Sequence, residues 1–378
     1  MAPVEGTCDA RFAGVKDALG TLLQEGADVG ASVAVNIAGE AVVDLWGGHA
    51  DAERTRPWER DTIVNVFSTT KTMTALCALM LADRGELDVH APVARYWPEF
   101  AAEGKDRIQV RHLLGHTSGL SGWQEPMTEQ DLYDWDVATS RLAAQAPWWE
   151  PGTQSGYHAA TQGYLVGEVV RRITGHSLGS FFAKEVAAPL GADFHIGLAP
   201  EHDARVATLI PPEASPLPEI EAGSVLERTL VNPPIAAEWA MNEGWRRAEI
   251  PAANGHGNAR SIARIQSVLA CGGEVDGVRL LSQQGCASVY EQQSDGVDLV
   301  LGLPIRFGLG YSLSTDAMPF DAGPRAFFWG GYGGSLVVID PEQSLTFAYA
   351  MNRMGQGTVG DERTAALLAA TYQALRRG

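Results

Sequence analysis

The chain has 378 residues, of which 45% are hydrophobic and 20% are charged, and this composition argues against an intrinsically disordered protein. Its formal net charge of −18 disfavours binding to nucleic acid or to an anionic membrane surface. The longest apolar run, residues 75–82, is too short to cross a bilayer, and the N-terminus lacks the basic-then-apolar order of a secretory signal. We therefore expect a cytoplasmic protein that binds neither nucleic acid nor membrane.

The cysteines and the acidic residues give no indication of a metal site. No cluster of His, Asp or Glu in the sequence has metal-ligand spacing. The four cysteines are scattered without C-x-x-C spacing, so we expect free thiols, no metal and no cofactor: Cys8, Cys77, Cys271 and Cys286.

The first predicted elements are a helix and a hairpin. Apolar residues recur at helical spacing over residues 11–24, and Gly26 is placed to end that helix. Two β-rich runs follow, at 32–37 and 41–45, separated by a short glycine-containing turn. An antiparallel sheet therefore starts near the N-terminus.

A serine and a lysine stand where a short β-prone run, 64–67, gives way to an amphipathic pattern that continues to residue 81. If a helix begins near Ser68, then Ser68 and Lys71 lie on one face, one turn apart. A lysine whose pKa is lowered can take the proton of a serine hydroxyl, and the helix N-terminus offers N–H groups to an oxyanion. The spacing predicts Ser68 as nucleophile and Lys71 as base, but S-x-x-K alone is a common pattern.

The middle of the chain is predicted to be helical, and strand patterns return only near the C-terminus. Short helices are expected at 89–96, 110–114, 129–144, 157–174 and 178–190. Strands are expected at 325–329, 336–340 and 345–351, and a last helix at 362–375.

This order of elements predicts an α/β (α+β) fold with an antiparallel sheet flanked by helices and an inserted all-helical region. The sheet domain would be assembled from both chain ends, residues 1–74 and 257–378, with 75–256 as the helical region. Within that region, residues 198–256 are rich in proline and are predicted to be either a covering loop over the site or a mobile excursion. The prolines concerned are Pro211, Pro212, Pro216, Pro218, Pro233 and Pro234.

A second serine motif competes with Ser68. Residues 175–179 read G-x-S-x-G, the pattern of a nucleophile elbow, which requires a strand immediately before it. The preceding residues instead have helical spacing with arginines at the end, so Gly175 is predicted to end that helix and Ser177 to cap the next one.

Several motifs together resemble the serine β-lactamase and penicillin-binding-protein superfamily. The resemblance is to its class C-like branch, nearest to family VIII carboxylesterases and related transacylases, and it implies a β-lactamase-like fold. Its motifs are S-T-T-K at 68–71, H-L-L-G-H-T-S-G-L at 112–120, E-P-G at 150–152 leading to Tyr157, G-Y-L-V-G at 163–167, P-L-G at 189–191 and F-W-G-G-Y at 328–332.

The resemblance implies roles for residues far apart in the chain. Tyr157 would share proton transfer with Lys71, and the two would form the general base jointly. The backbone N–H groups of Ser68 and Tyr332 would form the oxyanion hole, with Gly330 and Gly331 allowing the strand edge to approach the substrate closely.

Two departures from the family pattern bear on the substrate. Ala159 stands where penicillin-recognising members have an amide-binding asparagine, and Trp329 stands where they have a lysine, as in the esterase branch. An apolar or aromatic group beside Trp329 is therefore the expected guest, and strong β-lactamase activity is not expected. His158 either contacts substrate or faces solvent, and Trp123 is one of several tryptophans that could line the cleft.

The combined prediction is a serine acyl hydrolase, a carboxylesterase, that forms an acyl-Ser68 intermediate with small esters and uses no cofactor. The alternative is a transacylase that passes the acyl group to an amine or alcohol acceptor. A weak β-lactamase or D,D-peptidase and a catalytically silent binding protein are further alternatives. His112 and His116 are expected to hold a loop together through side-chain-to-backbone bonds.

Overall fold

A single antiparallel sheet dominates the computed structural model, which describes residues 3–213, 220–316, 318, 320 and 322–376. Within those residues the sheet has nine strands. In spatial order they are β1 (Val4–Cys8), β3 (Glu40–Gly48), β2 (Gly30–Ile37), β14 (Leu345–Met351), β13 (Leu336–Asp340), β12 (Phe327–Gly330), β11 (Ser312–Leu313), β10 (Pro304–Phe307) and β9 (Ser294–Val297). The predicted α/β fold with an antiparallel sheet is confirmed.

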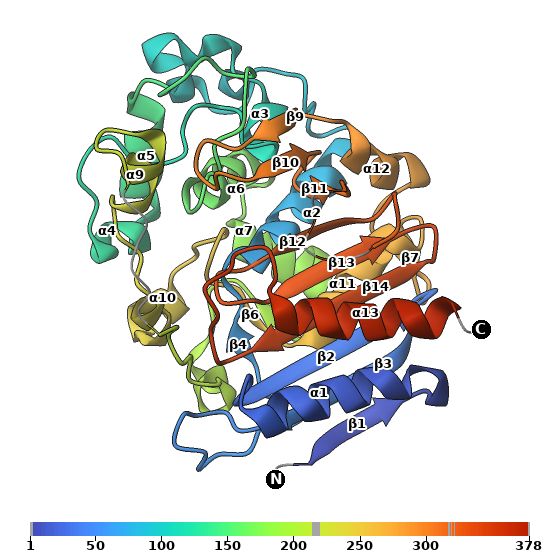
Figure 1. Ribbon diagram of the computed structural model, residues 1–378. Helices are drawn as coiled ribbons and strands as arrows, with labels where there is room; N and C mark the ends of the chain where they lie inside the picture. The colour runs from blue at the N-terminus through green and yellow to red at the C-terminus, as the bar shows by residue number, and fades with distance from the viewer. Residues whose placement is uncertain (1–2, 214–219, 317, 319, 321, 377–378) are drawn as a thin grey trace.

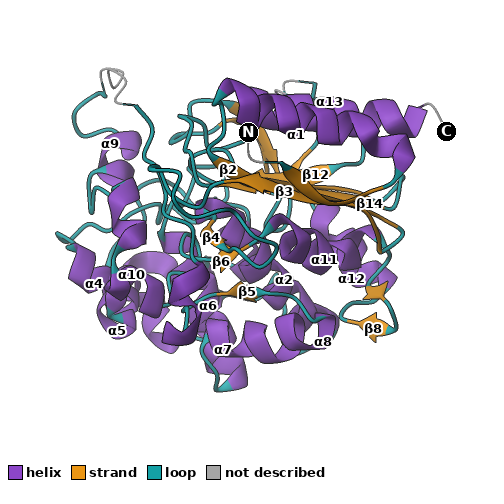
Figure 2. Cartoon of the chain, turned by 90° about the horizontal axis from the view of Figure 1, so that it is seen from below, coloured by secondary structure: helices purple, strands orange, loops and turns teal. Residues whose placement is uncertain are grey.

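The sheet joins the two ends of the chain. β2 pairs with β14 in antiparallel register, for example Val35 opposite Phe347, and both strands are almost entirely buried. Figures 1 and 2 show α1 (Ala13–Glu25) and α13 (Glu362–Arg376) side by side on one face, and α11 (Ala259–Ala270) on the other. The domain boundaries expected from the sequence stay a prediction.

The helix that follows Ser68 is more deeply buried than its sequence pattern suggested. α2 (Thr70–Asp83) is buried at every position from Thr70 to Leu81, so its amphipathic pattern has no exposed face over these residues, and the apolar run at 75–82 belongs to a buried helix. Helices of the inserted region and α12 (Gln283–Ala287) pack around it. A helix enclosed on all sides is a rigid base for the residues at its N-terminus.

The inserted region consists of short helices (Figure 1). The predicted helix at 129–144 is two helices, because Asp134 ends the first and caps the second through its bond from Val137 N. The helix predicted from residue 157 begins at Thr161. The helices of this region are α3 (Val110–Leu114), α4 (Glu129–Tyr133), α5 (Trp135–Ala144), α6 (Thr161–Thr174), α7 (Leu178–Phe182) and α8 (Ala188–Leu190), with a π-helical turn (Ala183–Ala187) between the last two and 3-10 turns at Val93–Arg95 and Pro98–Arg107.

Several elements were not predicted from the sequence. Strands do not return only at residue 325, because β9, β10 and β11 precede it. β9 has the polar sequence SDGV and is mostly exposed, and β10 begins with a proline, so neither has the pattern of a central strand. α11 and β1 were also missed. The remaining strands are β4 (Val64–Asn65), β5 (Phe194–His195), β6 (His256–Gly257), β7 (Glu274–Val275) and β8 (Val278–Arg279).

The described part of the proline-rich segment is packed against the rest of the molecule. It contains α9 (Val225–Leu230), α10 (Glu243–Arg247) and 3-10 turns at Pro200–Arg205 and Ala237–Met241. Trp245 is buried and donates a hydrogen bond to Asn65 in β4. Pro216 and Pro218 lie outside the described residues. Among the helices that are described, none has the length and apolar character that spanning a membrane requires.

Candidate active site

Ser68 lies in a 3-10 turn (Phe67–Thr69) between β4 and the start of α2. Phe67 has φ +42°, a conformation that costs free energy for a residue with a side chain and that often occurs at functional sites. Its ring packs against Tyr332 and Trp245, with centroids 5.6 and 6.2 Å away, and these contacts hold the strained residue in place. The hydroxyl of Ser68 is therefore presented by a fixed turn.

Lys71 has three hydrogen-bond partners, all of them uncharged. Its Nζ lies 3.1 Å from Ser68 Oγ, 2.6 Å from the Ala159 carbonyl and 3.0 Å from the Ala252 carbonyl. Burial lowers the pKa of Lys71 well below its usual value, and no described carboxylate forms an ion pair with it. In the neutral amine the two N–H groups can go to the two carbonyls, which leaves the lone pair facing Ser68 Oγ.

Tyr157 lies on the other side of the serine. It precedes α6 in irregular backbone, and its ring lies 4.7 Å from Lys71 Nζ. Its hydroxyl is close enough to the Ser68 side chain to affect the pKa of the phenol, and it accepts a bond of 3.3 Å from Trp329 Nε1. Burial raises the pKa of Tyr157, against smaller effects of these two contacts. The phenol is therefore protonated at neutral pH and lies beside Ser68 and Lys71.

The end of β12 abuts the backbone that precedes Ser68. A Cβ atom at Gly331 would lie 2.1 Å from the Val66 carbonyl oxygen, so only glycine fits there. Ser335 Oγ donates to the same carbonyl at 2.9 Å and thereby joins the two segments. Neither the Ser68 N–H nor the Tyr332 N–H donates to any described residue, so both are available to an oxyanion.

Gly330 and Gly331 were expected to let the strand edge approach substrate, but the structure gives another reason for glycine at these positions. Gly331 allows close approach to the main chain at Val66, and a Cβ atom at Gly330 would lie 2.7 Å from the Thr358 carbonyl oxygen. At both positions the atom nearest to an added Cβ belongs to the protein's own main chain. A direct role in substrate binding stays a prediction.

Trp329 forms part of an apolar cluster around Tyr157. Its ring centroid lies 5.2 Å from that of Tyr157 and 5.4 Å from that of Phe307. The buried members of the cluster all lack charge, and half-buried apolar residues pack on its edge. The buried members are Tyr157, Val300, Ile305, Phe307 and Trp329, and those at the edge are Ala159, Val225, Leu226 and Leu301.

His158 is fully buried, so the expectation that it might face solvent is wrong. Its Nδ1 lies 2.6 Å from the Gly156 carbonyl, which can only accept, and its Nε2 lies 2.6 Å from Ser118 Oγ. Nδ1 therefore donates and Nε2 accepts, which is the neutral tautomer. Burial lowers the pKa of His158 to about 3, in keeping with a neutral ring. Contact of His158 with substrate stays a prediction.

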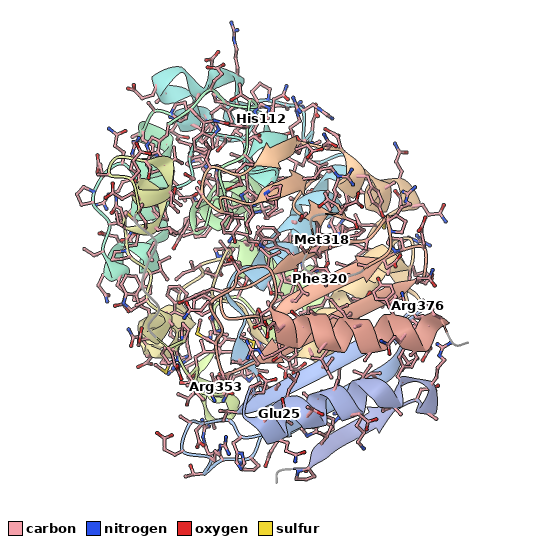
Figure 3. The ribbon with its side chains drawn as sticks, in the orientation of Figure 1. Glu25, His112, Met318, Phe320, Arg353 and Arg376 are labelled. Atoms are coloured by element: carbon pink, nitrogen blue, oxygen red, sulfur yellow. The ribbon has the colours of Figure 1, made fainter. Side chains whose placement is uncertain are left out.

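His116 and His112 hold loops through bonds to main-chain N–H groups, as predicted. His116 Nδ1 accepts from the His158 N–H at 3.1 Å, and His112 Nδ1 accepts from the Gln109 N–H at 3.3 Å. Figure 3 shows His112 among the helices of the inserted region.

Trp123 and Ser177 lie in structural positions. Trp123 is buried in the inserted region, where its Nε1 donates to the Ala138 carbonyl at 2.9 Å, and its predicted contact with substrate is not tested. Ser177 caps α7 by accepting from the Ser180 N–H, and Gly175, with φ +73°, ends α6. A helix and not a strand precedes this serine, so the motif at 175–179 is not a nucleophile elbow.

Two contributors to the site were missed from the sequence because they are main-chain atoms. The carbonyl oxygens of Ala159 and Ala252 accept hydrogen bonds from Lys71 Nζ, and any residue type could supply such carbonyls. Ala252 belongs to the proline-rich segment 198–256, whose composition suggested either a covering loop or a mobile excursion. No sequence signal could have found these carbonyls.

Comparisons with known proteins show what this chain is similar to. A family model described as Beta-lactamase matches residues 15–371. Esterase/beta-lactamase LipL from Mycobacterium tuberculosis is 38% identical over 368 residues, covering 93% of this chain and 83% of LipL. A solved family VIII carboxylesterase is 43% identical with a TM-score of 0.93, covering 98% of this chain and 99% of that one. A monacolin J acid methylbutanoyltransferase from Aspergillus terreus is 30% identical over 159 residues, covering 36% of this chain and 38% of the transferase.

Proposed function

Because the chain belongs to the beta-lactamase family, we propose that it is a serine carboxylesterase that acylates Ser68 with small esters. Family membership makes it a serine hydrolase or acyltransferase, and the resemblance predicted from the sequence is confirmed. The proposal narrows this class to ester substrates and assigns the steps to particular residues.

The observation that supports the proposal most directly is the set of partners around Lys71. Two carbonyls accept from its amine, and the third direction points to Ser68 Oγ at 3.1 Å. In the first step Lys71 takes the Ser68 proton while Oγ attacks the ester carbonyl, and the N–H groups of Ser68 and Tyr332 receive the oxyanion.

The second half of the reaction uses the same groups in reverse. Tyr157 and protonated Lys71 return a proton to the departing alcohol, which leaves an acyl-Ser68 ester. Water then gives up a proton to the same pair and attacks the acyl carbon. The bond from that carbon to Ser68 Oγ breaks, the proton passes to Oγ, and the carboxylic acid is released. The first of these transfers joins Lys71 Nζ and Ser68 Oγ, which lie 3.1 Å apart in the folded chain.

The environment of Trp329 favours esters over penicillins. Trp329 stands where penicillin-recognising members have a lysine, and its neutral indole cannot supply a cation for a carboxylate. An apolar acyl or alcohol group is the better guest. We therefore expect hydrolysis of p-nitrophenyl acetate to be much faster than hydrolysis of a chromogenic cephalosporin.

The proposal is tested by intact-mass measurement after treatment with a fluorophosphonate probe. The wild-type protein and Ser177→Ala should each gain one adduct, and Ser68→Ala should gain none. An adduct that survives Ser68→Ala, or no adduct on the wild type, would contradict the assignment of Ser68.

Acyl transfer is the second candidate, because one relative is named a methylbutanoyltransferase. It shares the acyl-Ser68 step and differs only in what attacks the intermediate. Product analysis with p-nitrophenyl butyrate and a panel of amine and alcohol acceptors separates the two functions. Free butyrate as the only product across the panel would rule out the transferase.

A further inference from the structure

The connection between β9 and β10 contains a buried carboxylate that the mechanism above does not use. Asp298 is 1% exposed. Its Oδ1 accepts from the N–H groups of Tyr157 at 3.0 Å, Val300 at 2.9 Å and Leu301 at 2.9 Å. Hydrogen bonds to an ionised oxygen are about twice as strong as those between neutral groups. This carboxylate therefore ties its own turn to the backbone of the tyrosine beside Ser68.

The other oxygen of Asp298 is an unsatisfied acceptor. Oδ2 is buried and has no hydrogen-bond partner, and the described chain contains no ion pair to this residue. Burying a carboxylate without a counter-ion costs free energy, so the residue is a poor choice if stability is its only role. A buried acceptor without a partner beside the candidate site is uncommon and calls for an explanation.

A second bond joins the same two segments. The Leu299 N–H donates to the Ser155 carbonyl at 2.9 Å, so the turn holds the chain on both sides of Gly156. Val300 also packs in the cluster that contains Tyr157. Because Tyr157 lies in irregular backbone ahead of α6, no helical hydrogen bonds fix it. The β9–β10 turn binds the Tyr157 N–H itself, while His116 accepts from the N–H groups of its neighbours Gly156 and His158.

We propose that Asp298 is a positioning residue of this site, which holds the main chain of Tyr157 and thereby fixes the phenol against Ser68 Oγ. The inference rests on the proposed function of Ser68 and Tyr157. Asp298 does not touch the reacting atoms. Its effect reaches the reaction only through Tyr157.

The test compares Asp298→Ala, Asp298→Asn and a control, Asp295→Ala, which removes an exposed carboxylate from β9. We expect Asp298→Ala to lower kcat for p-nitrophenyl acetate by about tenfold or more with KM nearly unchanged, because only the alignment of the phenol is lost. Asp298→Asn keeps an acceptor oxygen and should restore most of kcat. Asp295→Ala should behave as wild type.

Two further measurements show whether the effect passes through Tyr157. In a Tyr157→Phe background, Asp298→Ala should cause little further loss of kcat. Hydrogen exchange of peptides covering residues 155–160 should be faster in Asp298→Ala than in wild type. Unchanged kcat in folded Asp298→Ala, an equal loss in the Tyr157→Phe background, or unchanged exchange would each overturn the proposal.

The exchange measurement also separates this inference from the proposed function, because it does not depend on turnover. If the wild type fails to gain a fluorophosphonate adduct, the proposed function falls. Faster exchange in Asp298→Ala would still support the inference that Asp298 holds the backbone of Tyr157, whereas unchanged exchange would contradict that inference. If Asp298→Ala does not fold, Asp298→Asn decides through hydrogen exchange alone. Because a neutral oxygen holds its donors more weakly, exchange over residues 155–160 should be faster in that variant, and wild-type exchange would overturn the proposal.

Discussion

At the scale of single residues, two buried lysines in this chain, Lys71 and Lys105, differ in one hydrogen-bond partner. Lys105 Nζ donates to the carbonyls of Ala102, Ala143 and Gln145, which satisfies all three of its hydrogens. Lys71 Nζ is instead hydrogen-bonded to two carbonyls and one serine hydroxyl. Three carbonyls favour an ammonium ion, whereas two carbonyls and a hydroxyl also suit a neutral amine. The difference makes one lysine structural and the other a candidate base.

Replacing each lysine by methionine tests this distinction. Lys71→Met should lower kcat for p-nitrophenyl acetate by about 10²–10⁴-fold, the usual contribution of a general base. Lys105→Met should lower the melting temperature and leave the rate of p-nitrophenolate release per folded molecule unchanged. Equal loss of rate in both variants would contradict the role given to Lys71.

The pH dependence of kcat/KM follows from the same lysine. The amine acts as a base only when neutral, so activity should rise as the pH increases through the pKa of Lys71. Because burial lowers the pKa of Lys71 well below 10.5, the midpoint of that rise should lie well below pH 10.5. Lys71→Arg, which stays charged, should be inactive throughout. A wild-type midpoint near 10.5 would show that another group controls the reaction.

At the scale of elements, the site depends on the junction between β12 and the turn before α2. A Cβ atom at Gly331 would collide with the Val66 carbonyl, so the strand end and the turn cannot both keep their places. Gly331→Ala should therefore separate the N–H groups of Ser68 and Tyr332 and lower kcat by about 10²–10³-fold, the cost of losing one oxyanion donor. Gly20→Ala, where the nearest atom is 3.8 Å away, is the matched control and should keep wild-type kcat.

α9 is the second element with a testable role. Leu226 packs on the edge of the cluster that contains Tyr157 and Trp329, whereas Leu230, in the last turn of the same helix, is 44% exposed. If α9 forms part of the acyl pocket, Leu226→Ala should lower the ratio of kcat/KM for p-nitrophenyl butyrate over acetate by about tenfold. Leu230→Ala should leave the ratio unchanged. Equal ratios in all three proteins would place α9 outside the pocket.

What the sequence could predict at this scale depended on local pattern. The β2–β3 hairpin, β13, β14, α1 and α13 were predicted because their side chains repeat with the period of their own secondary structure. β9 and β10 were missed because pairing and packing, and not apolar content, hold them in the sheet. Asp298 was missed for the same reason, since its partners are N–H groups that become its neighbours only after folding.

At the scale of the whole molecule, α13 is tied to the N-terminal part of the sheet by a buried ion pair. Arg363 lies 2.8 Å from Asp28, which also accepts from the Tyr349 hydroxyl. Burial raises the pKa of Asp28, and the nearby guanidinium opposes that rise.

In the same half of the molecule, Figure 3 shows Phe320 beside β12, where its ring packs edge-on against Phe328 with centroids 5.1 Å apart.

Removing one partner of this ion pair should be costly. Arg363→Met would leave the Asp28 carboxylate buried without its cation and should lower the free energy of unfolding by about 3–5 kcal/mol. The double variant with Asp28→Asn should recover part of the loss, because no charge is then stranded. Urea unfolding followed by far-ultraviolet circular dichroism measures both. A single variant as stable as wild type would contradict the importance of the pair.

Arg363 also donates to the Gly333 carbonyl at 2.7 Å, in the turn that carries Tyr332. The residues of the site therefore become available in a fixed order during synthesis. Ser68 and Lys71 leave the ribosome early, Tyr157 follows, and the Tyr332 donor is supported only once α13 has emerged. A nascent chain therefore carries Ser68 for most of its translation before Tyr332 is held in place. On the proposed assignment of these residues, the site is complete only when the C-terminal helix has been made.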